Sequence, residues 1–434
     1  MYLAYSFLLT LGLVVIVPRL LSQALAHGKY VSSIRQRLGS LPGFTQSTVP
    51  TVWLHCVSVG ETQAARPLVA QLKRCFPDHR LVVSTITLTG QRLAREVFKN
   101  DAAHVVYFPF DWYWCVRRAL ATIKPDAVLI METELWPNFL RCCRRRGVPV
   151  ALVNGRISKQ SFRGYRIVRF FVSRVIANVS LAVMQSNDDA ERLRFLGMPQ
   201  NRLYVSGNLK FDAKPPATSD ALTEQIRAQF TLREEVPLIL AASTHAREEK
   251  MILDSFRKLR EEYPDIRLMI APRHPERFAE VASLLDSSGL TWVRRNQTTD
   301  AGVANAQVVL LDTIGELPAT YSLAKIVFVG GSLVERGGHN VLEPAAVGTA
   351  IVTGPHTDNF EAVVDLLDQN NAIIKLPRLD ENELVVRLYE VFHQLISAPK
   401  LREEMGQRAK QLVNANRGAA EKTVELIAPL LGAL

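Results

Sequence analysis

The chain has few cysteines, five in 434 residues, and no two of them form a C-x-x-C pair. A zinc ribbon or a disulfide framework is therefore not expected, and reduced thiols in a cytosolic compartment are favoured. Glycine and proline, at 23 and 22 residues, are near average usage, which excludes a low-complexity or collagen-like chain. The G-x-G-x-x-G dinucleotide fingerprint and the G-x-x-x-x-G-K-[ST] phosphate loop are both missing.

Long uncharged apolar runs are also missing, except at the amino terminus, so a multi-pass membrane protein is excluded. Residues 1–17 carry no charge, and basic residues follow from Arg19 onward. The run is at the short limit of the ~17–25 residues that a spanning helix needs, and it lacks the basic start of a signal peptide. We expect residues 1–22 to be a single membrane anchor, spanning or monotopic, with the body in the cytoplasm. A buried core helix is the alternative.

The chain is basic, with 52 Lys and Arg against 42 Asp and Glu, which gives a net charge of +10. This excess favours anionic partners such as nucleic acid, anionic lipid or phosphorylated substrates. Aromatic residues make up only 8% and no RNA-binding signature is present, so nucleic acid is not expected. Residues 162–176 interleave arginines with apolar residues. Such a helix would lie on an anionic membrane surface, or present a solvated arginine face above a packed core.

Short apolar runs alternate with stretches of helical length, first over residues 52–153 and again over residues 238–353. This alternation predicts an α/β protein with two doubly wound parallel sheets that face an interdomain cleft. Two prolines among small residues indicate a linker at 213–219. The expected organisation is an anchor at 1–22, a domain at 23–212, the linker, and a domain at 220–434 whose last helices can pack back on the first domain.

Ligands of such sheets bind beyond the carboxyl ends of the strands, so the residues that follow each run are the candidates. Glu61 follows the first run in Ser58-Val59-Gly60-Glu61-Thr62, and Glu132 and Glu134 follow the fourth. Each carboxylate is either a partner of a helix N-terminus or a group for acid–base chemistry.

The second half carries an arginine between prolines and a glycine-rich turn. Arg273 follows an expected strand and would bind phosphate or carboxylate. The segment 330–340 contains four glycines and one histidine and leads into a helix. The free N–H groups at the start of this helix would hold an anion. Simple turn formation is the alternative for these glycines. Glu343 would accept hydrogen bonds from ribose hydroxyls. The histidines are scattered, so no metal site is expected; they are His55, His245, His274 and His339.

Taken together, these motifs resemble the Kdo transferases, the 3-deoxy-D-manno-octulosonic acid transferases of bacterial lipopolysaccharide biosynthesis. Five segments carry the resemblance in order along nearly the whole chain: SVGET at 58–62, METELWPN at 131–138, GNLKFD at 207–212, APRHPERF at 271–278 and GGSLVERGGHN at 330–340.

The resemblance implies the GT-B fold, with an N-terminal acceptor-binding domain and a C-terminal CMP-sugar-binding domain. It implies CMP-Kdo as donor, the lipid A precursor as acceptor, and inversion without a metal or other cofactor. By position, Glu61 matches the general base, and Glu132 and Lys210 match the residues that stabilise the transition state. The CMP-binding segments match Pro272 and Arg273; Ile314, Gly315 and Glu316; and Asn340, Val341, Leu342 and Glu343. Val341 stands where the family usually has proline.

The chemistry fits these roles. An acceptor hydroxyl must lose its proton to a carboxylate as the bond forms, and we expect a helix N-terminus to keep Glu61 ionised. The N–H groups of 337–340, with Arg273, would stabilise the departing CMP. Lys210 would reach the carboxylate of Kdo. The lipid acceptor would place the enzyme at the cytoplasmic leaflet of the inner membrane.

Two other functions remain open on the sequence alone. One is a different GT-B glycosyltransferase or an epimerase that uses a UDP-sugar. The other is a noncatalytic membrane protein that binds anionic lipid through its arginines. The number of Kdo residues transferred does not follow from the sequence.

Overall fold

The computed structural model describes residues 2, 4–12, 31–45, 48–213, 220–233, 235–296 and 306–432. The second half of the expected anchor and nearly all of the expected linker at 213–219 lie outside these ranges. Residues 4–12 are helical. Among the described helices, none combines the length and the apolar character needed to cross a bilayer.

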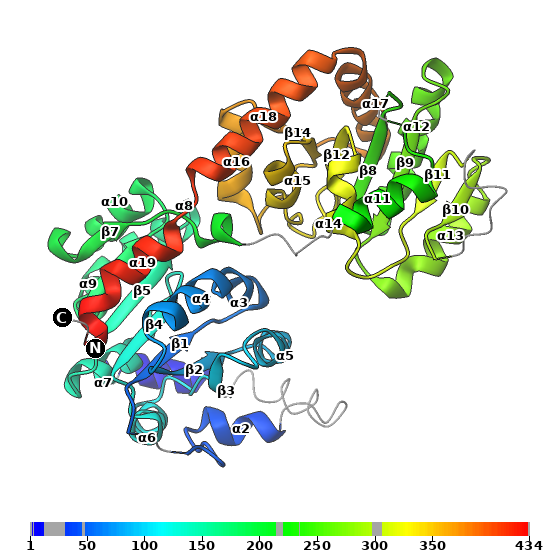
Figure 1. The fold of residues 1–434 in the computed structure, drawn as a ribbon. Coiled ribbons are helices and arrows are strands. Elements are labelled where there is room, and N and C mark those ends of the chain that lie inside the picture. The colour runs from blue at the N-terminus through cyan, green and yellow to red at the C-terminus, as the bar shows by residue number, and fades with distance from the viewer. Residues whose placement is uncertain are drawn as a thin grey trace. The chain divides into compact units, whose positions relative to one another are not determined.

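The chain divides into two compact units (Figure 1). Unit 1 consists of Met1–Ala213 together with Asn416–Leu434, and unit 2 is Lys214–Ala415. The carboxyl-terminal helix therefore belongs to unit 1, although unit 2 precedes it in the chain.

Unit 1 is built on a seven-stranded sheet in the order β3-β2-β1-β4-β5-β6-β7, with all pairs parallel. The runs of Val, Leu and Ile in its central strands are buried on both faces, as a parallel sheet between helices requires. The strands are β1 (Thr51–His55), β2 (Arg80–Thr85), β3 (Ala102–Tyr107), β4 (Ala127–Met131), β5 (Val150–Gly155), β6 (Leu181–Met184) and β7 (Leu203–Val205).

Helices cover both faces of this sheet, and each face has its own core. The α-helices are α2 (Val31–Arg37), α3 (Val59–Ala64), α4 (Arg66–Cys75), α5 (Leu88–Val97), α6 (Tyr113–Ile123), α7 (Pro137–Arg145), α8 (Lys159–Ile167), α9 (Arg169–Ile176), α10 (Asn187–Phe195) and α19 (Ala419–Ile427). Short 3₁₀ turns are η1 (Gln200–Arg202), η2 (Leu209–Asp212) and η6 (Ala428–Leu431).

Helix α19 is held in unit 1 by packing and by one carboxylate. Its apolar side chains, Val424 and Ile427 among them, join the same buried cluster as Leu68 and Leu72 of α4. Asp212 accepts hydrogen bonds from the N–H groups of Gly418 and Ala420, both at 2.6 Å. The first turn of α19 is thereby capped by a residue that precedes unit 2 in the chain.

The basic segment at 162–176 differs from the single helix that its sequence predicts. It forms α8 and α9, which are separated by a break at Val168 (φ −106°, ψ 28°). None of the residues of α8 is buried, whereas α9 buries Val172, Val175 and Ile176.

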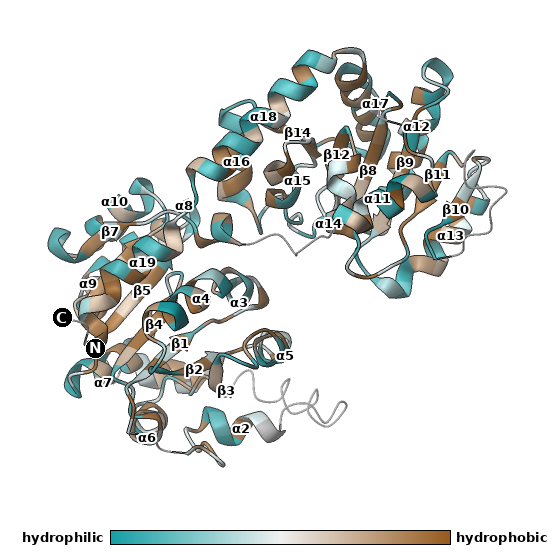
Figure 2. Cartoon of the chain, viewed as in Figure 1, coloured by the Kyte–Doolittle hydropathy of each residue, from teal (hydrophilic) through white to brown (hydrophobic). Residues whose placement is uncertain are grey.

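Unit 2 has a second seven-stranded parallel sheet, in the order β10-β11-β9-β8-β12-β13-β14. Hydrophobic residues gather in strands such as β8 and in α17, whereas α18 is largely hydrophilic (Figure 2). The strands are β8 (Leu238–Thr244), β9 (Arg267–Pro272), β10 (Trp292–Arg294), β11 (Val308–Leu310), β12 (Ile326–Val329), β13 (Ala350–Thr353) and β14 (Ile374–Lys375).

The helices of unit 2 are α11 (Asp220–Gln229), α12 (Glu248–Glu262), α13 (Phe278–Asp286), α14 (Leu317–Thr320), α15 (Leu342–Val347), α16 (Glu361–Gln369), α17 (Glu381–Ser397) and α18 (Pro399–Ala415), with 3₁₀ turns η3 (Pro275–Arg277) and η5 (Tyr321–Leu323). Helix α18 passes so close to the end of α15 that a Cβ at Gly406 would overlap the carbonyl oxygen of Gly348. The two parallel α/β sheets that the sequence predicts are confirmed.

Candidate functional site

Glu61 lies at the carboxyl end of β1, in the first turn of α3. Ser58 caps this helix, and its hydroxyl donates to Glu61 Oε1 at 3.1 Å. The N–H of Val57 donates to Glu61 Oε2 at 2.8 Å. The residue is only 7% exposed. Both carboxylate oxygens are therefore held by the strand end, and the side chain has one well-defined orientation.

The strand next to β1 supplies two more carboxylates. Glu132 follows β4 in a left-handed conformation (φ 55°), and Glu134 stands two residues later. A positive φ is rare for a residue other than glycine and marks local strain. The sheet order places the ends of β1 and β4 side by side, where the strand order reverses.

Burial, followed by the charges of Glu132 and Glu134, raises the pKa of Glu61 to about 8. The hydrogen bonds from Val57 and Ser58 act in the opposite direction. The expectation that a helix N-terminus keeps Glu61 ionised is therefore wrong, because desolvation and two neighbouring carboxylates outweigh the local donors.

Lys210 belongs to the same group. It lies in η2, close to the point where the chain leaves unit 1 for unit 2. Its turn η2 is fixed by two asparagines: Asn208 Oδ1 accepts from the N–H of Lys210, and Asn154 Oδ1 accepts from the N–H of Leu209, both at 3.0 Å. Burial lowers the pKa of Lys210, Glu132 and Glu61 raise it, and Arg156 lowers it further.

The structure thus brings Glu61, Glu132 and Lys210 into one electrostatic group at the switch point of a single sheet. The sequence reasoning gave no role to Asn154 and Arg156. Asn154 lies at the end of β5 and Arg156 directly after it, and this position at a strand end was the signal that could have found them.

In unit 2, Pro272 ends β9 and Arg273 follows it with an exposed side chain. The N–H of Arg273 donates to the carbonyl of Thr244 at 3.0 Å, which fixes its backbone against β8. This places its guanidinium at the carboxyl edge of the sheet.

The segment Ile314, Gly315 and Glu316 lies between β11 and α14. Ile314 is 81% exposed, and Gly315 has φ +88°. Glu316 accepts from Arg295 at 2.9 and 3.2 Å and from the hydroxyl of Thr313 at 2.7 Å. Its carboxylate is therefore already engaged by its neighbours.

The segment from Asn340 to Glu343 forms a compact turn in which Val341 and Leu342 are buried. Asn340 Oδ1 accepts from the N–H of Leu342, and Asn340 Nδ2 donates to Glu343 Oε1, both at 3.0 Å. Burial raises the pKa of Glu343, whereas its hydrogen bonds with Asn340 and Tyr321 lower it.

The glycine-rich turn does not offer the free amides that its sequence predicts. The N–H of Gly338 donates to the carbonyl of Gly331 at 2.8 Å, and the N–H of His339 donates to the carbonyl of Gly330 at 3.2 Å. For these residues the expected amide nest at 337–340 is wrong, because the turn folds back and hydrogen-bonds with itself.

The amides at the end of β12 are also engaged, by a buried carboxylate. Glu248 accepts from the N–H groups of Gly331, Ser332 and Leu333 at 2.7–2.9 Å, and from that of His245 at 2.8 Å. These backbone N–H groups are therefore not available to an incoming anion.

The histidines are less scattered than the sequence indicates. His245 and His339 are joined by their Nε2 atoms at 2.8 Å, and the ring of His274 lies 5.3 Å from that of His245. His55 is apart from them, buried in unit 1 against Ser84 and Phe108. Within the described ranges, no three His, Cys, Asp or Glu side chains are grouped to hold a metal ion.

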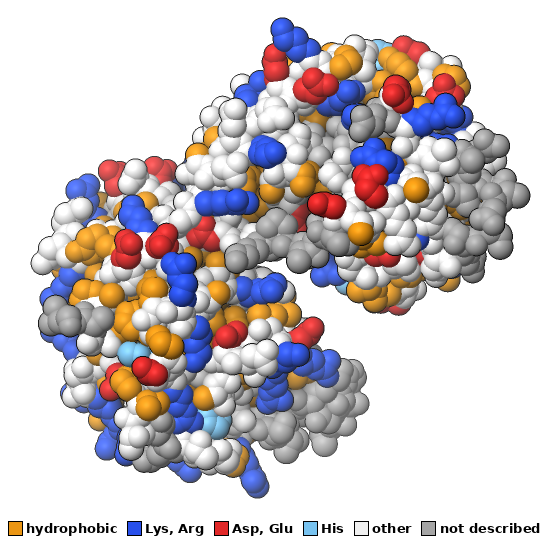
Figure 3. Space-filling view, in the orientation of Figure 1, with side chains coloured by type: hydrophobic (Ala, Val, Ile, Leu, Met, Phe, Trp, Pro, Cys, Tyr) orange, Lys and Arg blue, Asp and Glu red, His pale blue; other side chains and the backbone are white. Residues whose placement is uncertain are grey.

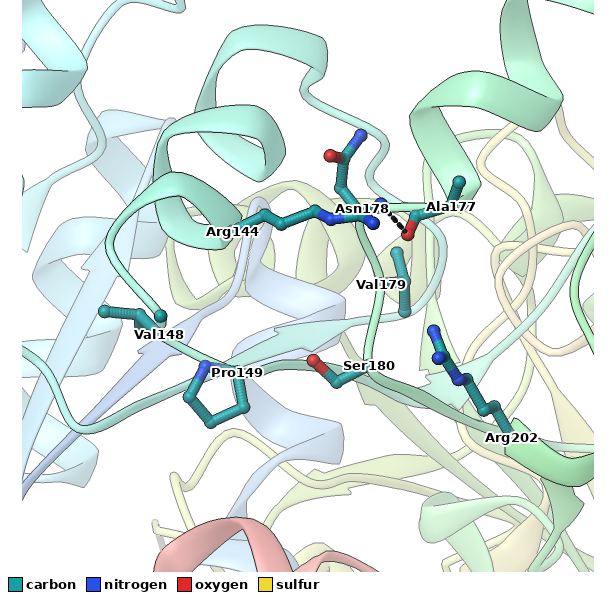
Figure 4. Close-up of a pocket in the computed structure, with 9 residues that line it drawn as sticks. Arg144, Val148, Pro149, Ala177, Asn178, Val179, Ser180 and Arg202 are labelled. Carbon is teal, nitrogen blue, oxygen red and sulfur yellow. Dashed lines mark hydrogen bonds between the residues drawn. The ribbon is translucent and has the colours of Figure 1, made fainter.

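A polar cavity of about 250 Å³ opens at the other end of unit 1, where β5 and β6 begin (Figure 4). Arg144 and Arg202 point into it, and Arg144 donates to the carbonyl of Ala177 at 2.8 Å. None of the site residues that the sequence predicts lines it.

Comparison with known proteins separates the same two halves. Residues 32–213 match the family model of 3-deoxy-D-manno-octulosonic-acid transferase (kdotransferase), and residues 223–412 match that of glycosyl transferases group 1. The chain is 35% identical to the 3-deoxy-D-manno-octulosonic acid transferase of Haemophilus influenzae, over 92% of each chain. It is 33% identical to that of Bordetella pertussis, over 88% of this chain and 87% of the other.

Solved structures resemble it more distantly. MurG of Acinetobacter baumannii aligns with a TM-score of 0.56 at 14% identity, over 88% of this chain and 99% of the other. Staphylococcus aureus MnaA in complex with UDP aligns at 0.55 and 17%, over 89% and 98%. At these identities the likeness concerns the fold, a GT-B-like pair of α/β domains.

Proposed function

The chain belongs to the 3-deoxy-D-manno-octulosonic acid transferase family and is a glycosyltransferase, and on this basis we propose that it transfers Kdo from CMP-Kdo to the lipid A precursor. In this proposal unit 1 binds the acceptor and unit 2 binds the CMP-sugar. The anomeric configuration is inverted, and no metal or other cofactor takes part.

The observation that carries the mechanism is the environment of Glu61. An acceptor hydroxyl attacks the anomeric carbon, its proton passes to Glu61, and the bond between that carbon and the phosphate oxygen breaks. A base works best when its pKa is near the working pH, and the pKa of Glu61 is raised to about 8. Its two held oxygens keep the carboxylate aimed during the transfer.

Lys210 and Glu132 are the proposed electrostatic partners of the reacting sugar. The ammonium of Lys210 would pair with the Kdo carboxylate, and Glu132 would face the positive charge that develops at the anomeric carbon. The electrostatic interaction between Glu132 and Lys210 in the free enzyme supports this arrangement, because it places the two side chains in one group; there Glu132 opposes the lowering of the Lys210 pKa by burial.

For the nucleotide, we assign CMP to Pro272 and Arg273, to residues 314–316, and to residues 340–343. Since Glu316 is already bound to Arg295, its segment would contact the nucleotide through the backbone and Ile314. Glu343 and Asn340 form a polar pair that could accept the ribose hydroxyls.

The proposed location is the cytoplasmic leaflet of the inner membrane, with the amino-terminal segment as anchor. The helix at 4–12 docks on unit 1: Asn138 donates to Ser6 Oγ at 2.9 Å, and the ring of Tyr5 lies 6.2 Å from that of Phe171 in α9. Its opposite side is apolar and open, with Phe7 68% and Leu8 64% exposed.

Helices α8 and α9 also expose apolar residues: Ile167 is 86% and Phe170 is 71% exposed. Arginines stand beside these residues; Arg174 lies over the ring of Phe170 at 4.0 Å. On the face drawn in Figure 3, Lys and Arg side chains are spread among hydrophobic ones over unit 1. Apolar groups with basic neighbours are suited to an anionic lipid surface. We call Phe7, Leu8, Leu11, Ile167 and Phe170 the apolar face.

The deciding experiment is a transfer assay with CMP-Kdo and the lipid A precursor. Mass spectrometry would count the Kdo residues added, a parallel reaction would contain EDTA, and UDP-sugars would replace CMP-Kdo in a third. Transfer from CMP-Kdo that survives EDTA supports the proposal. Loss of activity with EDTA contradicts the metal independence, and transfer only from a UDP-sugar contradicts the donor.

A further inference from the structure

A histidine pair stands at the switch point of the sheet in unit 2. The strand order reverses between β8 and β12, and ligands of such sheets bind in the crevice beyond this point. His245 is the first residue after β8, and the loop after β12 brings His339 back to it. Their rings are stacked with an interplanar angle of 6°.

The backbone is shaped to allow this pair. Gly331 has φ +69°, and a Cβ there would lie 2.9 Å from His339 Nε2 and 3.4 Å from His245 Cδ2. The N–H of His245 is fixed by Glu248, and that of His339 by the carbonyl of Gly330. The two rings are therefore held together by the fold around them.

The hydrogen bond between the Nε2 atoms restricts the protons of the pair. One ring must donate its Nε2 proton, and the other must present a bare Nε2 and, when neutral, carry its proton on Nδ1. The two Nε2 atoms cannot both carry a proton while this bond exists. The resting pair thus holds a vacant position for one proton.

The surroundings of the pair are strongly positive. Burial first, and then His274, Arg336, Arg277 and Arg273, lower the pKa of His245 to about 4. Burial, His245, Arg273 and His274 lower the pKa of His339 to about 4.

The acids on neighbouring elements bind backbone N–H groups or neighbouring cations. Glu248 binds backbone N–H groups, and Glu249 and Glu280 bind Arg277 at 2.6 and 2.9 Å. Glu276 lies 3.8 Å from His274. Arg273 and Arg336 also place positive charge near the pair, and an incoming phosphate would offset it.

We propose that His245 and His339 hold the phosphate of the donor nucleotide and take up one proton from solvent when it binds. This inference rests on the proposed function and names its phosphate subsite. The proton breaks the bond between the rings, and both Nε2–H groups then donate to phosphate oxygens. As the bond from the anomeric carbon to the phosphate oxygen breaks, the electron pair stays on the phosphate, and the imidazolium balances the new charge.

This arrangement replaces the amides that the glycine-rich turn has already used. Arg273, which adjoins the pair, would add a guanidinium to the same phosphate. Two imidazoles and one guanidinium would supply the positive charge that stabilises departing CMP from this chain's own side chains.

Titration calorimetry with CMP and with cytidine tests the proposal on the full chain. At pH 7.5 the CMP phosphate is already mostly dianionic, so proton uptake belongs to the protein. Binding measured in buffers of different ionisation enthalpy should show net proton uptake for CMP and none for cytidine. His339→Gln keeps one donor but cannot titrate; it should weaken CMP binding about ten- to hundredfold and leave cytidine binding unchanged.

His245→Gln should behave in the same way, and it serves as the second variant if His339→Gln melts at a lower temperature. The matched control is His393→Gln on α17, where the ring binds Glu262 at 3.0 Å away from the pair. Equal weakening of CMP and cytidine, or proton uptake that persists in either pair variant, would overturn the subsite.

The same titrations with UMP and uridine keep this test separate from the donor assignment. If UMP binds more tightly than CMP, the proposed donor is wrong, yet the phosphate-dependent loss in His339→Gln still decides the role of the pair. If CMP binds best but its affinity is unchanged in both His245→Gln and His339→Gln, only the phosphate subsite is wrong.

Discussion

The N–H of Val57 donates to the carboxylate of Glu61, four residues later, at 2.8 Å. Val57 lies just beyond β1 and Glu61 in the first turn of α3, so the strand end and the helix start hold one carboxylate between them. Ser58 completes the arrangement from the cap position. The proposed base is thus oriented by its own turn, before any substrate is present.

Replacing Glu61 with glutamine should abolish transfer and spare the nucleotide site. Glutamine keeps the size of the side chain but cannot accept the hydroxyl proton, so kcat should fall about 10²- to 10⁴-fold. CMP affinity, measured by calorimetry, should stay unchanged, because the assigned nucleotide residues belong to unit 2. Activity near the wild-type level would remove Glu61 from the mechanism. Ser58→Ala is the control, since it loses one hydrogen bond but keeps the carboxylate.

The pH profile of kcat/KM should rise through about pH 8, because only the ionised form of Glu61 can take a proton and its pKa is raised to about 8. Below that point the rate should fall about tenfold per pH unit. Glu134→Gln removes a charge that raises this pKa, so its rising limb should move to lower pH. A limb that stays in place in this variant would assign the ionisation to another group.

The stability of the fold should depend on the same ionisation. It should decrease as the pH rises, whereas the activity should increase. The pKa of Glu61 rises from 4.5 to about 8 on folding, so the unfolded chain loses its proton first as the pH increases. The contribution is fully present below pH 4.5 and is lost as the pH rises toward 8. Denaturant unfolding should therefore show Glu61→Gln gaining stability relative to wild type between these limits. A difference that is independent of pH would contradict the shift.

Gly406→Ala should destabilise unit 2, because its new methyl group would overlap the carbonyl of Gly348 where α18 meets α15. Forced overlap of this kind costs about 1–3 kcal/mol or more. Gly164→Ala in α8 is the matched control: no atom lies within 4 Å of its Cβ position, and it should gain about 0.5–1 kcal/mol. Thermal unfolding of Gly406→Ala and Gly164→Ala would test this difference, and equal melting temperatures would refute the overlap.

Glu248→Gln should loosen the turn after β12. The amide has one acceptor oxygen where the carboxylate offers two, so buried N–H groups of Gly331, Ser332 or Leu333 lose their partner. Each such group costs about 1–3 kcal/mol. Hydrogen exchange should increase at these amides, with Glu404→Gln on α18 as an exposed control. Unchanged protection from hydrogen exchange would mean that the turn is stable without the carboxylate of Glu248.

The apolar face should determine attachment to lipid. Phe7→Ser combined with Phe170→Ser removes two largely exposed rings and should reduce cosedimentation with vesicles containing anionic phospholipid severalfold. Activity on a detergent-solubilised acceptor should persist. Val386→Ser, an exposed apolar residue in unit 2, is the control. If the wild type, the double variant and Val386→Ser bind the vesicles equally, the attachment to lipid lies elsewhere.

The sheets were largely predictable because their strands are short apolar runs that need no distant information. Within the two regions of alternating runs, the apolar runs at 127–131 and 326–329 predict strands, and they coincide with β4 and β12. The strands β6, β7, β10 and β14 were not predicted; all have four residues or fewer, and Trp292–Arg294 and Ile374–Lys375 are only partly buried. A weak periodic signal over so few residues cannot be separated from a loop.

The site was predictable in its membership but not in its charges. Glu132 directly follows β4, and Glu61 lies in the first turn of the helix after β1, where the fold class directs attention. The raised pKa of Glu61 depends first on burial that only the packed unit creates, and then on Glu132 and Glu134, some 70 residues away in sequence. The amides of Gly331 and Gly338 looked free, because no local pattern shows that Glu248 and the turn itself would bind them.

The return of α19 to unit 1 has a consequence for biosynthesis. Because Asp212 caps a helix that begins at Ala419, a nascent chain that has emerged only as far as residue 213 still lacks a covering for Leu68 and Leu72. Unit 2 lies between the two parts of unit 1 in the chain, so unit 1, although begun first, is completed only after all of unit 2 has been synthesised. A chain that lacks residues 416–434 would thus leave part of the core of unit 1 uncovered, although this unit is begun first.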